Sequence, residues 1–171
     1  MKRMIGVILA IAVAAGCAVV AEARPTAGGS LDRNHRSADV TFTKWVTSPS
    51  ADTSTAAGSG MAGVVGGDVG RGVFVGMVVK DDTTSKPHFW LGQPLYGVFG
   101  SKHSFVANNF ITEDDRDPNT ITATIRGVVM MGWMKGARVT GEYTQFDKCP
   151  IPTPGNVLHH VCFRGTLHLQ G

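Results

Sequence analysis

Charged side chains are scarce in this chain, and none of them forms a familiar catalytic pattern. Asp, Glu, Lys and Arg together make up 17% of the 171 residues. The chain has no Gly-x-Ser-x-Gly motif, so nothing predicts the nucleophile elbow of an α/β-hydrolase. No pair of carboxylates with the character of a glycosidase site stands out either. The sequence therefore gives no sign of a nucleophile or of a glycosidase acid pair.

Excess positive charge is missing from the part of the chain that we expect to fold. Residues 39–171 carry eleven Lys and Arg against eleven Asp and Glu, so the whole-chain excess of +3 comes from residues 1–38. A domain that binds nucleic acid normally shows a basic excess on its folded part. We therefore expect no nucleic-acid partner.

Long apolar runs are limited to the N-terminus, where residues 4–20 follow Lys2 and Arg3. A basic start before such a run is typical of a secretory signal peptide. A transmembrane helix is the alternative, but the run is close to the shortest length that spans a bilayer and contains glycines. We predict that residues 1–23 are a signal peptide and that the rest is exported.

The end of this segment offers two ways of processing the chain. Ala21 and Ala23 supply the small residues that a signal peptidase needs, which predicts cleavage between Ala23 and Arg24. Cys17, preceded by small residues, resembles the acylated cysteine of a bacterial lipoprotein signal. We expect a secreted or periplasmic, cell-envelope protein, with membrane association only if Cys17 is lipidated.

Cysteine is rare, with three in the chain. Cys17 lies in the predicted signal peptide, which leaves Cys149 and Cys162 as the pair in the exported domain. In an oxidising compartment we expect them to form a disulfide, which would stabilise the fold by about 3 kcal/mol. A redox or metal pair is the alternative, but the Cys-x-x-Cys spacing typical of such pairs is missing.

The histidines give no metal-ligand pattern. His159 and His160 are adjacent, so on a regular strand they would point to opposite faces. His103 and His168 have no carboxylate or cysteine at ligand spacing. Asp68 lies in a glycine-rich turn, but no Lys-Ser/Thr pair follows it, so turn chemistry is favoured over a phosphate loop. We expect neither a metal nor another cofactor.

No stretch has a convincing helical period, and apolar residues instead recur at every second position. In residues 120–131 the odd positions, from Ile121 to Met131, form an apolar face opposite Thr and Arg. Residues 132–136 make a tight connection to the next alternating stretch, which predicts a hairpin. Residues 73–79 are apolar on both faces, as expected if another element covers the outer one.

These patterns predict an all-β domain over residues 39–171, after a flexible tail over residues 24–38 and with a loop over residues 47–60. Short strands without helical crossovers form an antiparallel barrel or sandwich, and eight strands leave room inside for side chains or one small ligand. The expected strands are 39–46, 61–65, 73–80, 89–99, 103–112, 120–131, 137–146 and 161–169.

Several stretches resemble a known family, and residues 132–143 are the most distinctive of them. The others are residues 42–46, 61–70, 72–76, 102–105, 125–129 and 162–167. Together they are similar to bacterial exported proteins with an allene oxide cyclase-like barrel domain. The resemblance implies an antiparallel eight-stranded barrel related to plant allene oxide cyclases and dirigent proteins.

The plant enzymes of this family cyclise an unstable fatty-acid epoxide without a cofactor, chiefly by holding its chain in an apolar cavity. No plant catalytic set maps residue by residue onto this chain, and a shared fold does not establish a shared activity. Glu142 is the one candidate catalytic carboxylate, with Arg138 on the same strand face. The alternation favours the outer face for Glu142, where it would form only an exposed ion pair.

The aromatic residues supply a large apolar lining, and for most of them an ordinary place in the core is the alternative to ligand binding. We expect Trp90, Tyr96, Phe105 and Tyr143 to bind a ligand. Phe89 and Trp90 are consecutive, so they must face opposite sides of a strand, and one of them lies at a mouth, an interface or a second apolar layer.

Three functions fit these observations. The first is an exported barrel that binds a small apolar, lipid-like ligand without a cofactor. The second is a cofactor-independent isomerase or cyclase of the allene oxide cyclase kind. The third is a solidly packed barrel whose outer face pairs subunits in a homo-oligomer. A cavity separates the first two from the third, and an ionisable group inside it separates the first from the second.

Overall fold

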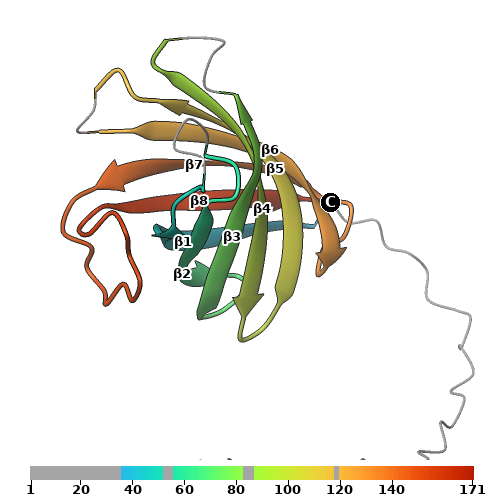
Figure 1. Ribbon diagram of the computed structural model, residues 1–171. Coiled ribbons are helices and arrows are strands. Elements are labelled where there is room, and N and C mark those ends of the chain that lie inside the picture. Colours follow the sequence, from blue (N-terminus) through green and yellow to red (C-terminus); the bar gives the residue numbers. More distant parts are fainter. Residues whose placement is uncertain (1–35, 52–55, 83–86, 118–119) are drawn as a thin grey trace, which may run out of the picture. The chain divides into compact units, whose positions relative to one another are not determined.

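The computed structural model describes residues 36–51, 56–82, 87–117 and 120–171. The predicted signal peptide, the Ala23–Arg24 cleavage site, Cys17 and most of the predicted tail lie outside these residues. Within them the chain forms eight strands (Figure 1). They are β1 (Ser37–Ser48), β2 (Gly60–Gly67), β3 (Gly72–Asp82), β4 (Phe89–Gly100), β5 (Ser104–Asp114), β6 (Thr122–Gly132), β7 (Arg138–Phe146) and β8 (Cys162–Gln170).

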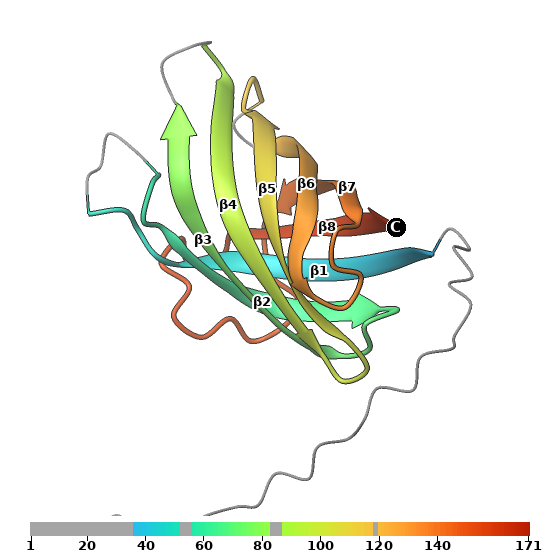
Figure 2. The ribbon, with the colours of Figure 1, turned by 90° about the vertical axis from the view of Figure 1, so that its right-hand side faces the viewer.

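The strands close into a barrel, which confirms the all-β, antiparallel, eight-stranded prediction. Each strand pairs with the next along the chain, and β8 returns to pair with β1 (Figures 1 and 2). Closure leaves no unpaired strand edge. Among the described residues no helix has the length and apolar character needed to cross a membrane.

The barrel begins two residues earlier than predicted, at Ser37. Ala38 pairs with Leu169 of β8, and its side chain is buried in the core. Residues 37 and 38, which the sequence placed in the tail, therefore belong to β1. The sequence does not show this because a single small residue gives no apolar run by which a strand could be recognised.

The predicted inner face of β6 is confirmed up to Val129. Ala123, Ile125 and Val129 are buried, whereas Met131 is 60% exposed. The register between β5 and β6 shifts here, because Val106 pairs with Met131 while the next residue of β5 pairs with Val129. This β-bulge inserts one extra residue and turns Met131 outward. The predicted connection over residues 132–136 does join β6 and β7 as a hairpin.

The outer face of β3 lacks the cover that the sequence led us to expect. Val73, Val75, Met77 and Val79 are all exposed, at 45–53% of their surface. No element within the described residues packs over them, so that expectation is wrong for this part of the chain. The predicted homo-oligomer, which would cover such a face, stays a prediction.

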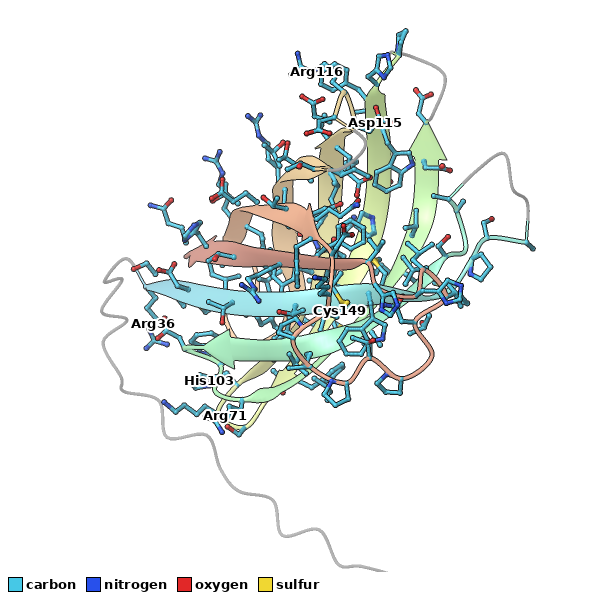
Figure 3. All side chains as sticks on the ribbon, turned by 90° about the vertical axis from the view of Figure 1, so that its left-hand side faces the viewer. Arg36, Arg71, His103, Asp115, Arg116 and Cys149 are labelled. Carbon is cyan, nitrogen blue, oxygen red and sulfur yellow. A yellow bond between two sulfur atoms is a disulfide. The ribbon has the colours of Figure 1, made fainter. Side chains whose placement is uncertain are left out.

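The two ends of the barrel differ. The short turns that follow β2, β4 and β6 lie at one end, which we call the closed end because Val69, Phe105 and Ala137 fill it. The loops that follow β1, β3, β5 and β7 lie at the other, the mouth end. Figure 3 shows His103 at the closed end and Asp115 at the opposite end.

Candidate functional site

A cavity of about 350 Å³ lies inside the barrel at the mouth end. Its volume falls in the lower part of the range for pockets that bind small molecules. Most of its walls are apolar, and seven of the eight strands contribute to them. The lining residues are Lys44, Val46, Ala56, Ser59, Met61, Val78, Trp90, Pro94, Tyr96, Ile111, Glu113, Ile121, Tyr143, Leu158 and Phe163.

An aromatic layer, made of Phe42, Phe74, Tyr96 and Tyr143, crosses the barrel, and its two tyrosines line the floor of this cavity. Phe74 packs edge-on against Tyr96, with 4.8 Å between ring centroids, and stacks on Phe42 at 5.6 Å. Tyr143 meets Phe42 edge-on at 6.4 Å. All four rings are buried. The hydroxyl groups of Tyr96 and Tyr143 are the polar part of this layer, and both residues line the cavity.

Lys44 is the most unusual residue of the site. It follows Val40 and Phe42 on the inner face of β1, and 3% of its surface is exposed. Its Nζ donates a hydrogen bond of 2.8 Å to Tyr96 Oη and lies 3.9 Å from the ring centroid of Tyr143. Burial lowers the pKa of Lys44 from 10.5 to about 8, opposed by the negative charge of Glu113. A buried amine of this kind can lose its proton near neutral pH.

Glu113 supplies the opposite charge. It is the penultimate residue of β5, and it lies two positions beyond the buried Ile111 on the inner face. The Tyr143 hydroxyl donates a hydrogen bond to Glu113 Oε1. Burial raises the pKa of Glu113, while the Lys44 charge and the Tyr143 hydrogen bond lower it. This carboxyl can therefore exchange a proton at a higher pH than an exposed glutamate would.

The two tyrosine hydroxyls connect these ionisable groups to the floor. Burial and the nearby Glu113 charge raise the pKa of Tyr96 and of Tyr143 well above 10. Both phenols therefore stay neutral and act as hydrogen-bonding groups. One amine, one carboxyl and two phenols thus face a mainly apolar cavity. This set can bind a polar group and can move a proton to or from it.

Trp90 forms one wall of the cavity near the mouth. Its indole lies over Gly92, where a Cβ would come within 2.0 Å of the ring. Its Nε1 donates a hydrogen bond of 3.2 Å to Asp81 Oδ2. Phe89, the preceding residue, lies on the other side of the strand, with the Arg116 guanidinium 5.5 Å from its ring centroid. The expected division of the two aromatic residues between opposite faces is therefore confirmed.

The loop between β7 and β8 covers part of the cavity and is tied to the barrel. Cys149 and Cys162 form the predicted disulfide, with 5.6 Å between their Cα atoms. Trp45 Nε1 donates a hydrogen bond of 3.2 Å to the Pro154 carbonyl oxygen of this loop. Leu158, on the same loop, lines the cavity. The disulfide thus holds one wall of the site in place.

Three of the four residues predicted to bind a ligand are brought together. Trp90, Tyr96 and Tyr143 all line the cavity. Phe105 is instead buried at the closed end, where it packs in the core and does not line the cavity. Glu142, the candidate catalytic carboxylate, is exposed on the outer face of β7. It therefore cannot act in this cavity. The alternation in the sequence had favoured this outer position.

Sequence reasoning missed Lys44 and Glu113, although the signal was present. Lys44 continues the row of alternate residues Ala38, Val40 and Phe42 on β1, which is otherwise apolar. Glu113 continues the inner row of Phe105 and Ile111, but it also begins the acidic run of residues 113–117, which is typical of a turn. In both strands the alternation used for β6 places the charged residue inside.

The remaining polar candidates lie outside the cavity. The Asp68 carboxylate accepts a hydrogen bond of 2.8 Å from the Asp39 backbone N–H, in agreement with a turn role. His103 stacks on Trp133 at the closed end, with 4.1 Å between centroids. His168 contacts the Asp39 carboxylate at 2.6 Å on the outer surface. In the described parts of the chain, no three His, Cys, Asp or Glu side chains group closely enough to hold a metal ion.

Comparisons with known proteins add no assignment. No family model matches the chain, and neither the curated proteins nor the solved structures give a match.

Proposed function

We propose that this chain is an exported barrel protein that binds a small, mainly apolar ligand with one polar group in the cavity at its mouth end. The observation that supports this proposal most directly is the cavity, which is about 350 Å³ in volume and lined mostly by apolar side chains. The Cys149–Cys162 disulfide supports export, because disulfides persist in oxidising compartments. The resemblance to allene oxide cyclase-like proteins supports a barrel that holds an apolar chain.

We expect the polar group of the ligand to carry no net charge. Lys44 and Glu113 carry opposite charges when both are ionised, so they balance each other within the cavity. An ionic ligand would leave one uncompensated charge buried, which costs several kcal/mol. A carbonyl or hydroxyl oxygen can instead accept a hydrogen bond from the Lys44 ammonium, which donates to Tyr96 and has further N–H groups.

Binding can be tested with N-phenyl-1-naphthylamine, a neutral apolar dye whose fluorescence rises when it leaves water. We expect saturable binding that Val46→Trp removes, because Val46 lines the cavity and the indole would fill it. Val157→Trp is the matched control, since Val157 is exposed on the nearby loop and does not line the cavity. Equal binding by both variants, with melting temperatures unchanged, would refute the proposal.

Native mass spectrometry of the protein purified from its own envelope fraction would identify a retained ligand. The same spectrum would distinguish cleavage after Ala23 from acylation at Cys17. A cavity of about 350 Å³ argues against the third interpretation, a solidly packed and purely structural barrel.

A cofactor-independent isomerase or cyclase is the second candidate, and the ionisable groups in the cavity favour it. Glu113 and Lys44 both face the space where a substrate would lie. Glu113→Gln keeps the shape of the side chain but removes the charge, so it should abolish turnover of a retained ligand while keeping dye binding. Isomerisation leaves mass unchanged, so the product must be detected by chromatographic retention.

A further inference from the structure

We propose that Lys44 captures an apolar aldehyde or ketone in this cavity as an imine, so that the ligand is held covalently and reversibly. This inference rests on the proposed ligand binding and specifies the chemical class of the ligand.

The position of Lys44 is the first argument. It lines the cavity, whereas Lys80, Lys102, Lys135 and Lys148 are exposed on the outside of the barrel. Within the described ranges Lys44 is therefore the one lysine that a ligand in the cavity can reach. A carbonyl at the inner end of an apolar chain would meet this amine on the floor.

The surroundings of the amine are the second argument. Nζ lies 3.9 Å from the Tyr143 ring centroid, 5.1 Å from that of Tyr96 and 5.5 Å from that of Phe163. The hydrogen bond to Tyr96 Oη holds the nitrogen in one position. It also replaces one of the water contacts that an exposed lysine would have. The amine is thus held at one place in an apolar space, as in lysines that form Schiff bases.

The protonation state of the amine supports the same conclusion. Burial lowers the pKa of Lys44 to about 8. At about pH 7 roughly a tenth of Lys44 is then the neutral, nucleophilic amine, which is more than about a hundred times the fraction in an ordinary exposed lysine. Lys44 should therefore react before the exposed lysines do.

The chemistry needs no cofactor or oxidant. The Nζ lone pair attacks the carbonyl carbon, a C–N bond forms, and one proton moves from nitrogen to oxygen to give a carbinolamine. The C–O bond then breaks, and the oxygen leaves as water with the two former amine protons. Glu113, whose pKa burial raises, can donate and accept these protons at the edge of the cavity. Hydrolysis by the reverse steps releases the ligand.

The test uses the purified full chain with octanal as the probe and sodium cyanoborohydride to reduce any imine to a stable secondary amine. Peptide mapping by mass spectrometry then measures the modification of each lysine. We expect Lys44 to be modified at least about ten times faster than Lys135, with a rate that rises with pH to a midpoint near the pKa of about 8. Octan-1-ol, which has the same chain and no carbonyl, should slow the reaction at Lys44 alone.

Two variants provide controls. Lys44→Met should lose the fast modification, and the exposed Lys135→Met should keep it. Peptide mapping of the unchanged protein also answers the question if Lys44→Met fails to fold. Equal modification of all lysines, or none at Lys44, would overturn the imine proposal. If the neutral dye still binds and is displaced by octan-1-ol in that case, the cavity binds apolar ligands without covalent capture; if the dye does not bind either, the proposed function fails as well.

Discussion

The burial of Lys44 should make the stability of the barrel depend on pH in the alkaline range. The amine has a pKa of 10.5 in the unfolded chain and about 8 in the folded protein. Between these values the unfolded chain binds a proton that the folded protein has released. The free energy of unfolding therefore rises as pH increases through this window, and the gain is lost again as pH falls through about 8.

The size of the effect follows from the shift in pKa. Each pH unit of difference is worth about 1.4 kcal/mol, so the full window corresponds to about 3 kcal/mol. Between about pH 7 and pH 9.5 the rise should be about 2 kcal/mol, because part of the titration lies outside this interval. Lys44 is buried to 3% exposure, so solvent does little to screen the effect. Higher pH is unsuitable, since Tyr96 and Tyr143 ionise in the unfolded chain above about pH 10 but resist ionisation when folded.

Urea denaturation followed by tryptophan fluorescence measures this free energy at each pH. Lys44→Met should lose the rise, because methionine fills a similar space without a proton to release. Lys102→Met, at an exposed position, should keep it. A wild-type curve that is flat from about pH 7 to 9.5, or one that Lys44→Met reproduces, would refute the buried amine.

Other changes probe the floor, the loop and the electrostatics of the site. Phe74→Ala should lower the free energy of unfolding by about 4 kcal/mol, since it leaves a cavity in the buried aromatic layer; urea denaturation would show this, and a loss below about 1 kcal/mol would contradict it. Replacing Cys149 and Cys162 with serine should cost about 3 kcal/mol and weaken dye binding, because the loop over the cavity loses its anchor; unchanged melting and binding would count against that role. Glu113→Gln should lower the pKa of Lys44 below about 8, since the carboxylate charge raises it; the pH midpoint of aldehyde trapping measures the change, and an unchanged or higher midpoint would refute the coupling.

Much of the fold could be predicted because side-chain direction along a strand is a local property. The alternation from Ile121 onward correctly identified the buried face of β6, and the glycines around residue 134 marked the hairpin. The disulfide was also predictable, because only Cys149 and Cys162 remain after the predicted signal peptide. The bulge that exposes Met131 was not, since it depends on how β5 and β6 pair.

The site was only partly predictable for the same reason. Local pattern identified Trp90, Tyr96 and Tyr143 as large aromatic residues at suitable positions, but it gave Phe105 equal weight. A ring at the closed end and a ring beside the cavity have the same sequence signature. Their position along the barrel axis depends on the stagger of all eight strands, which no single strand encodes.

The sequence by itself determined that the domain is all β, which cysteines pair, and which residues share a face of a strand where no bulge interrupts the alternation. Each of these follows from short-range pattern or from simple counting. Only the tertiary structure decided that Lys44 of β1 and Glu113 of β5 face one cavity above Tyr96 and Tyr143. These residues are far apart in the chain and meet because β8 pairs with β1 and closes the sheet. Closure removes water from the inner face, and that loss of water gives the amine and the carboxyl their unusual proton affinities.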